Sequence, residues 1–321
     1  MTYFLFDYPI SLSPPSVVKL LNSLPCHSYG SPRTNNRLVG WLKGVRQMLR
    51  VSSRNDIIIC GFDFQAILLW WICLLTLRKR KIICINILLK TKVTLKNRLV
   101  ASLYHYALKN KNIRATVTSK EYGNYIQRRL GLKNKIMVLH DRFIPIEPIE
   151  NVEVKYDAFC GGSNGRNWSL LFDVAKRMPN ISFRAVMTEK DWLQYRASIP
   201  SNVYVLHNVS FRKFLLEMQQ CRLVTLPINT EAPAGLMVVF QAASLHKPVI
   251  ITDTISTREY LSDSRGYLVS NDAAEWVRTI LHCLNNSKEG EKSSLKLLNF
   301  LERECSEEHF VQRLQSIIDH M

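Results

Sequence analysis

Glycine is scarce in this chain, and its cysteines follow no metal-binding or redox spacing. Only 12 of the 321 residues are glycine, and three of them fall within Gly161–Gly165. The eight cysteines include no Cys-x-x-Cys pair, and several stand in apolar runs such as Ile59-Cys60 and Phe159-Cys160. This pattern favours small buried side chains in a reducing compartment over a zinc site or a disulfide framework.

Low-complexity segments and a recognisable leader are also lacking. Met1–Asp7 has no basic region and turns polar at once, so we expect no secretory signal and a cytoplasmic protein. With 47% hydrophobic and 21% charged residues, the composition is that of an ordinary globular protein. A length of 321 residues is sufficient for two domains.

Acidic residues are in short supply only in the first half. Residues 1–150 hold 24 Lys and Arg against 7 Asp and Glu, whereas residues 151–321 hold 19 of each. Such asymmetry predicts that the first half meets an anionic partner, namely nucleic acid, anionic lipid or a phosphorylated acceptor. No helix-turn-helix, zinc or RNA-binding signature is present there, so we expect no nucleic-acid partner.

Short apolar strands alternate with helices along the first half, which is typical of a parallel sheet covered on both faces. The expected strands are Thr2–Phe6, Ile57–Cys60, Ile82–Leu89, Ala115–Thr118 and Lys135–Leu139, and the expected helices are Val17–Leu24, Gln65–Leu77, Lys96–Lys109 and Lys120–Leu130. Arg78–Lys81 is expected to cap the C-terminal end of Gln65–Leu77.

The pattern restarts after a proline-rich linker at Pro145–Pro148. The strands expected there are Asp157–Cys160, Ile181–Met187, Val203–Leu206, Leu223–Leu226 and Val249–Thr252, and the helices are Ser169–Arg177, Phe211–Gln220, Leu236–Leu245, Ala273–Leu284 and most of Lys292–His320. We therefore expect two α/β domains, 1–145 and 146–305, with a cleft between them, and a C-terminal helix over 306–321 that is free to pack back toward the first domain.

The glycine cluster forms the first candidate phosphate site. A strand ends at Cys160, the turn Gly161-Gly162-Ser163-Asn164-Gly165 follows, and a helix begins near Asn167. Glycines let a backbone approach phosphate closely, and Arg166 could hold the anion with two N–H groups. The turn is neither a Walker loop nor a spaced Gly-x-Gly-x-x-Gly motif, so an ordinary turn with a surface arginine remains an alternative.

The second candidate is Pro233–Asp253, a Pro-Ala-Gly turn followed by a helix, the breaker Lys247-Pro248 and a buried strand. Unpaired N–H groups and the helix dipole make such a turn an anion site. Glu231 just before it could bind sugar hydroxyls, and Gln241 in the helix could reach a ribose. A solvated loop glutamate and a helix-surface glutamine are the alternative interpretation.

Residues 157–260 resemble the donor half of GT-B glycosyltransferases, especially the family-4 enzymes of bacterial surface polysaccharide synthesis. The matching residues are Gly161-Gly162, Arg166, Gly235-Leu236, Gln241-Ala242, Lys247-Pro248-Val249-Ile250 and Glu259-Tyr260-Leu261. More faintly, Ala115–Ser119, Tyr125 and Leu130-Gly131-Leu132 look like the end of the family's acceptor half. The resemblance implies two Rossmann-like domains with parallel sheets facing across a cleft.

Several residues depart from the family pattern. Pro233 stands eight positions before Gln241, where the family has an acid, and Glu231 lies two residues away. Gln241 replaces the second glutamate, and His246 replaces a glycine. Leu171 stands where a second phosphate-binding lysine is usual, which leaves Lys213 and Lys247 as substitutes. The loop Ser11–Pro15 lacks the family's glycines.

The resemblance implies a retaining transfer of sugar from a nucleoside-diphosphate sugar, without metal or other cofactor. The donor would be bound by Gly161, Gly162, Ser163, Arg166, Glu231, Pro233, Ala234, Gly235, Leu236, Met237 and Gln241, with Arg166 and Glu231 also in catalysis. An inverting reaction would need a base in the first half. Asp7 and Asp63, each just past a strand, are the candidates, although a helix-cap or turn role fits each as well.

Enzymes of this kind often act on a lipid-linked glycan, such as lipopolysaccharide, O-antigen, capsule or exopolysaccharide. The cations Arg78–Lys81, Lys90, Lys92, Lys96 and Arg98 could bind anionic headgroups and place the protein on the inner face of the membrane. Ala66–Leu77, with Trp70 and Trp71, is too short to span a bilayer and fits either an interfacial helix or a core helix. A UDP-sugar epimerase of the same fold and a non-catalytic partner subunit remain alternative functions.

Overall fold

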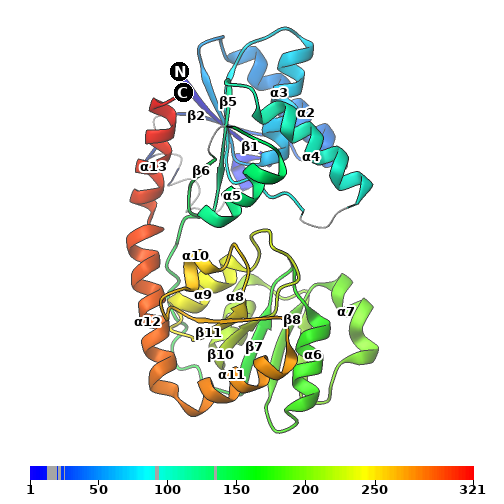
Figure 1. The fold of residues 1–321 in the computed structure, drawn as a ribbon, viewed down its shortest axis with the longest axis vertical. Coiled ribbons are helices and arrows are strands. Elements are labelled where there is room, and N and C mark those ends of the chain that lie inside the picture. The colour runs from blue at the N-terminus through cyan, green and yellow to red at the C-terminus, as the bar shows by residue number, and fades with distance from the viewer. Residues whose placement is uncertain (13–19, 21–22, 25, 91–93, 134–135) are drawn as a thin grey trace. The chain divides into compact units, whose positions relative to one another are not determined.

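The protein forms two compact units, each built on one parallel sheet. The computed structural model describes residues 1–12, 20, 23–24, 26–90, 94–133 and 136–321. One unit comprises Met1–Arg142 together with Cys305–Met321, and the other comprises Phe143–Glu304 (Figure 1). Lys92, most of the helix expected over 17–24, part of the loop 11–15 and the start of the strand expected at Lys135 lie outside the described residues.

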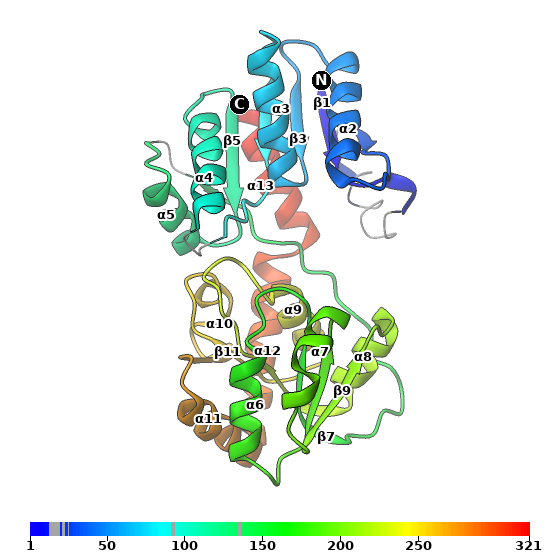
Figure 2. The same ribbon diagram turned by 90° about the vertical axis from the view of Figure 1, so that its right-hand side faces the viewer.

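The first unit contains a sheet of six parallel strands in the order β2-β1-β3-β4-β5-β6. The strands are β1 (Thr2–Phe6), β2 (His27–Gly30), β3 (Ile57–Cys60), β4 (Lys81–Cys84), β5 (Ile113–Val117) and β6 (Met137–Val138). The helices are η1 (Ile10–Leu12), α2 (Arg37–Val51), α3 (Asp63–Leu75), α4 (Leu95–Leu108), α5 (Lys120–Arg129) and α13 (Glu307–Asp319). In Figure 2, α3 and α4 lie in front of this sheet and α13 behind it.

The last helix of the chain completes the core of this first unit. In the register of the sheet, Phe4 of β1 pairs with Ile59 of β3, and Ile59 with Ile83 of β4. Because side chains alternate between the faces of a sheet, this row points to one side. It packs there against Phe310 and Leu314 of α13, which are 8% and 0% exposed.

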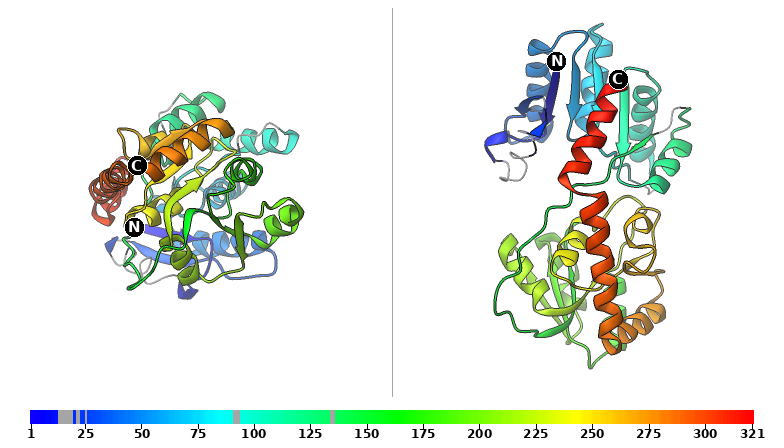
Figure 3. Two further views of the ribbon diagram at one scale, coloured as in Figure 1. Left: turned by 90° about the horizontal axis from the view of Figure 1, so that it is seen from below. Right: turned by 90° about the vertical axis from the view of Figure 1, so that its left-hand side faces the viewer.

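The second unit contains another parallel sheet, in the order β12-β11-β10-β7-β8-β9. Its strands are β7 (Tyr156–Gly161), β8 (Phe183–Met187), β9 (Val203–His207), β10 (Cys221–Leu226), β11 (Val249–Thr252) and β12 (Tyr267–Val269). Its helices are α6 (Trp168–Arg177), α7 (Glu189–Tyr195), η2 (Arg196–Ser198), α8 (Phe211–Gln219), α9 (Leu236–Ser244), α10 (Arg258–Leu261), α11 (Ala273–Asn285) and α12 (Ser287–Glu304). Helices α6 and α11 pack together on one face, with Trp168 and Trp276 fully buried. In the right-hand view of Figure 3, the red C-terminal helix α13 lies in front of the sheet of the first unit.

Two elements of the first unit have no counterpart among the expected ones. Strand β2 and helix α2 fill a segment that the apolar pattern left unassigned. Its helix signal is nevertheless present, because the Asn36 side chain accepts a hydrogen bond from the Leu38 N–H, and Trp41, Val45 and Met48 follow at helical spacing and are buried.

Two expectations for β4 and for the basic segment before it were wrong. The strand expected to run to Leu89 ends at Cys84, because Asn86 turns into the left-handed region with φ 46°. Arg78 and Arg80 also cap a different helix from the one expected. Their side chains donate to the backbone oxygens of Leu49 (3.2 Å) and Ser52 (2.6 Å) at the C-terminal end of α2.

Candidate functional site

Arg166 is a buried cation held by the glycine turn that precedes it. The turn follows β7, and α6 begins two residues beyond Arg166. Arg166 is 7% exposed; its Nε donates to the Gly161 oxygen (2.6 Å) and its Nη1 to the Asn164 oxygen (3.1 Å). Burial lowers the pKa of the guanidinium. The alternative of a surface arginine is therefore wrong.

The second turn packs directly on the first. It leaves β10, passes Ile228 and ends at Gly235, which caps α9 with φ 81°. The Asn229 N–H donates to the Gly165 oxygen (2.9 Å), and Arg166 forms an isolated antiparallel bridge with Ile228. The resemblance assigns both turns to one donor-binding half, and in the structure the two turns are in direct contact.

The Arg166 guanidinium lies between glycines of both turns. A Cβ at Gly162 would stand 2.5 Å from Nη2 of Arg166, and a Cβ at Gly235 would stand 3.3 Å from Nη1. Both glycines also have positive φ, 108° and 81°. Glycine is thus required at each position by conformation and by space. Within the described part of the chain, Nη2 makes no hydrogen bond, so one edge of the cation is available to an anion.

The other predicted donor-binding residues of these turns differ in accessibility. Ser163 and Met237 are exposed, and Pro233 and Gly235 are half-buried. Ala234 and Leu236 are 6% and 4% exposed, so they can offer a ligand their backbone N–H groups rather than their side chains.

Glu231 forms hydrogen bonds within the second unit through both its side chain and its backbone. Its Oε2 accepts a hydrogen bond from the Ile255 N–H (3.0 Å), and its backbone oxygen accepts one from Ser256 Oγ (2.8 Å). These contacts fix the loop after β11 beside the second turn. The side chain is exposed, so its carboxylate remains accessible to a hydroxyl-bearing ligand.

Gln241 lies inside the protein and has an unsatisfied acceptor. It is 8% exposed on α9, and its Oε1 has no hydrogen-bond partner among the described residues. The alternative of a helix-surface glutamine is therefore wrong. An unpaired buried acceptor costs about 1–3 kcal/mol, which a ligand or water bonded to it would recover.

The two lysines considered as second phosphate ligands are differently placed. Lys247 precedes β11 at its amino end and interacts electrostatically with Cys221 at the start of β10, so it lies at the edge of the sheet opposite the glycine turns. Burial lowers its pKa. Lys213 is at the N-terminal end of α8, but its Nζ pairs with Glu217 (2.7 Å), a fully buried acid that also binds Arg184. Lys247 is therefore excluded, and Lys213 is already partnered.

Asp63 is a buried structural group of the first unit. It is 5% exposed at the start of α3, where it accepts hydrogen bonds from the N–H groups of Phe64 (2.7 Å) and Leu88 (2.9 Å). Burial raises the pKa of this carboxyl, while hydrogen bonds from Leu88 and Tyr104 oppose the shift. The contacts support the turn role rather than that of an accessible base.

We expect Asp63→Asn to retain transferase activity and to change the pH dependence of stability. Because its folded-state pKa is raised, the Asp63 carboxyl contributes most to stability below the unfolded-state pKa, near 3.9. This contribution is lost as the pH rises through the folded-state pKa. Urea midpoints of the parent should thus fall relative to those of Asp63→Asn as the pH rises above about 4. A loss of about 100-fold in kcat with unchanged midpoints would instead identify a catalytic base.

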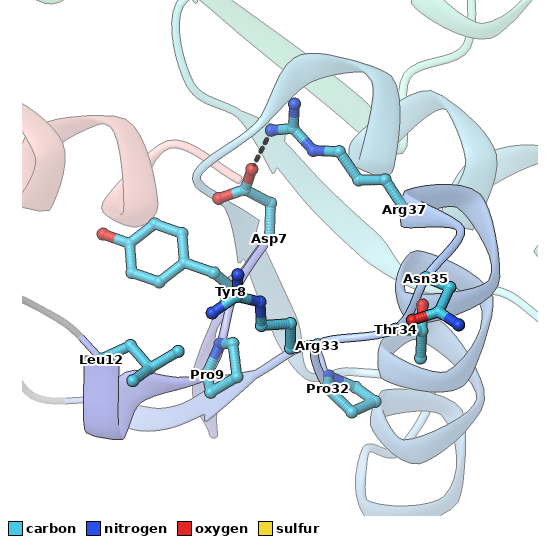
Figure 4. A pocket seen from close by; sticks show the side chains of 9 residues that line it. All are labelled: Asp7, Tyr8, Pro9, Leu12, Pro32, Arg33, Thr34, Asn35 and Arg37. Carbon is cyan, nitrogen blue, oxygen red and sulfur yellow. Dashed lines mark hydrogen bonds and ion pairs between the residues drawn. The ribbon is translucent and has the colours of Figure 1, made fainter. Parts of the chain in front are cut away.

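Asp7 lines a pocket of about 530 Å³ at the carboxyl end of β1 (Figure 4). Its Oδ2 pairs with Arg37, whose guanidinium also lies 5.0 Å from the centre of the Trp41 ring. Tyr8 and Arg33 are further lining residues. The sequence did not indicate this pocket, although the polar run 33–37 before α2 was a usable signal. Among the described residues, no group of three or more His, Cys, Asp or Glu could hold a metal ion.

Comparisons with known proteins bear on the second unit and on the fold. Residues 169–286, a little over a third of the chain, match the family model "Glycosyl transferases group 1". A search of the curated proteins finds no match.

The match to solved structures of the same architecture covers the whole chain. HepE from Anabaena, in complex with UDP and glucose, is 12% identical with a TM-score of 0.70 over 100% of both chains. A glycosyltransferase from Rickettsia africae is 10% identical with a TM-score of 0.65, covering 99% of this chain and 98% of its own. The lipopolysaccharide outer core galactosyltransferase WaaB is 13% identical with a TM-score of 0.63 over 100% of both chains. At these identities the likeness establishes the fold, and the GT-B expectation is confirmed.

Proposed function

We propose that this chain, which has the GT-B fold and matches the group 1 glycosyl transferase family over residues 169–286, transfers a sugar from a nucleoside-diphosphate sugar to a growing, lipid-linked surface glycan. Lipopolysaccharide, O-antigen, capsule and exopolysaccharide are the acceptor classes considered. The observation that carries the proposal is the buried Arg166 guanidinium between Gly162 and Gly235. HepE was crystallised with UDP and glucose, and WaaB is a lipopolysaccharide galactosyltransferase, which supports both ends of the proposed reaction.

Stabilisation of the departing diphosphate is the central catalytic task. The bond between the anomeric carbon and the phosphate oxygen breaks, and negative charge grows on the diphosphate. The positive edge of Arg166 faces this charge, joined by backbone N–H groups at Gly161–Ser163 and Ala234–Leu236. Donors fixed before the reaction stabilise charge without reorganisation, and the dipole of α9 adds to them.

Sugar and ribose hydroxyls are assigned to the two remaining polar groups of the site. The exposed carboxylate of Glu231 accepts hydrogen bonds from the transferred sugar, and the unpaired Oε1 of Gln241 accepts one from a ribose hydroxyl. The acceptor hydroxyl then forms the new glycosidic bond and passes its proton to the departing phosphate oxygen. We propose retention at the anomeric carbon, with no protein nucleophile.

A thermal-shift panel with UDP, GDP, CMP and dTDP tests the donor site. We expect one diphosphate to raise the Tm, because ligand at 100 times its Kd adds about 2.7 kcal/mol to stability. Stabilisation by none of them would refute donor binding and favour a non-catalytic partner subunit. Release of an epimerised sugar nucleotide in the absence of acceptor would favour the UDP-sugar epimerase.

The basic first unit supports a location on the inner face of the plasma membrane. Arg78–Lys81, Lys90, Lys96 and Arg98 supply positive charge, each worth about 1 kcal/mol next to anionic lipid. Across the described ranges, no helix is long and apolar enough to cross a membrane.

A further inference from the structure

Helix α3 buries its first turns and exposes its last one. It begins at the carboxyl end of β3 with buried Asp63 and packs Ile67 and Trp70 into the core. Thirteen residues of helix span about 20 Å, so its C-terminal end reaches the amino edge of the sheet. Leucine side chains emerge there: Leu74 is 48% exposed, Leu75 78% and Leu77 91%.

Leu77 occupies a backbone position that favours glycine. Its φ is 54°, and the hydrogen bond from the Arg78 N–H to the Cys73 oxygen (2.8 Å) closes the helix around it. Glycine is the usual residue at this point of a helix C-terminus, because a Cβ is strained in the left-handed region. A leucine with its side chain almost wholly in water gains no packing in return. The stability of the fold therefore does not explain this residue.

Cations and a small pocket adjoin these leucines. A pocket of about 190 Å³ is lined by Leu77 together with Trp70, Leu74, Lys79, Asn110 and Asn112. Arg78 and Arg80 also line it, and both donate to backbone carbonyls at the C-terminal end of α2. These carbonyl bonds leave the charge of Arg78 in place, whereas Arg80 also interacts electrostatically with Asp56. Exposed apolar side chains thus lie next to amide groups and at least three cations.

We infer that this surface, Leu74–Lys79 with its pocket, docks on an anionic lipid bilayer, an inference that deepens the lipid-linked acceptor of the proposed function and rests on it. The leucines enter the boundary between headgroups and acyl chains, and the cations meet the lipid phosphates. Charge complementarity identifies lipid as the occupant. A second copy of the chain would bring together two equally basic surfaces, which repel.

The docking surface and the Asp7 pocket belong to opposite edges of one sheet. The pocket lies at the carboxyl end of β1, and the docking surface at the amino ends of β4 and β5. Binding to lipid therefore leaves the carboxyl edge open to a glycan.

Leu77→Gly separates this role from folding. Glycine relieves the positive-φ strain, so we expect an unchanged or higher Tm. Loss of the inserted leucine should weaken binding to phosphatidylglycerol-containing vesicles about tenfold in a flotation assay at low salt. Lys79→Glu should also weaken flotation, and Leu193→Ala, at a 52% exposed leucine of the second unit, should not.

Three results would overturn the inference. They are equal flotation of Leu77→Gly and the parent protein, no flotation of the parent, and equal binding to pure phosphatidylcholine vesicles. The nucleotide thermal shift measured on the same preparations keeps the two proposals apart. A normal shift without flotation refutes docking alone, whereas flotation without any shift refutes the donor site alone.

Discussion

Replacing Arg166 by alanine is expected to lower kcat/KM for sugar transfer about 100-fold or more and to abolish the thermal shift caused by the diphosphate. Loss of one preorganised donor to a developing charge costs about 3–4 kcal/mol, which corresponds to at least two orders of magnitude in rate. The cation is buried and flanked by Gly162 and Gly235, so no mobile surface side chain can take its place. Steady-state kinetics and nucleotide titration measure the effect.

Arg166 also holds its own turn, so its removal needs matched controls. Gly162→Ala keeps the arginine but puts a Cβ 2.5 Å from Nη2, and it should impair transfer as well. Gly131→Ala also puts a Cβ at a positive φ (58°), at a position where nothing lies within 4 Å, and it should leave transfer intact. Arg177→Ala removes an exposed arginine from α6 and should be neutral. An Arg166→Ala enzyme that folds and retains parental activity would contradict the assignment.

Leu314→Ala is expected to destabilise the first unit by about 2–5 kcal/mol. Leu314 of α13 is fully buried against the row of apolar residues on β1, β3 and β4. Truncation therefore removes apolar burial and leaves a cavity in a core that can collapse only partly. Urea unfolding measures the loss, and hydrogen exchange shows where it acts.

Protection should fall in residues 1–142 and change little in residues 143–304, because Leu314 packs within the first unit. Gln312→Ala, on the exposed side of the same helix, should change stability by less than about 0.5 kcal/mol. Equal loss of protection in both units would show that they unfold as a single cooperative block.

The sequence predicted the parallel sheets best, because buried strands leave a strong apolar signal. Ile57–Cys60 and Val249–Thr252 were expected as strands and form β3 and β11 with the same bounds. Shorter or more polar elements were missed. His27–Gly30 forms β2 by pairing with the apolar strand β1 rather than by its own pattern. Such a strand depends on its neighbour, which a local pattern does not contain.

Site residues were harder to predict, because their environment is set by contacts between distant segments. The sequence indicated two glycine turns, but the burial of Arg166 depends on how those turns pack. Lys247 was a reasonable phosphate ligand by residue type, yet the direction of β11 places it at the other edge of the sheet. For Gln241 the sequence left a ribose-binding and a helix-surface role open, and the structure shows a buried side chain with an unpaired oxygen.

The packing of α13 on the first sheet also sets an order of events during synthesis. Domains of a nascent chain generally fold in turn from the N-terminus. Here the ribosome must first make all of residues 143–304 before α13 can emerge, which takes on the order of ten seconds at about 5–20 residues per second. Until then the apolar row of Phe4, Ile59 and Ile83 lacks the cover that α13 provides. The unit that is translated first is therefore completed last, and its nascent form is a natural client for chaperones.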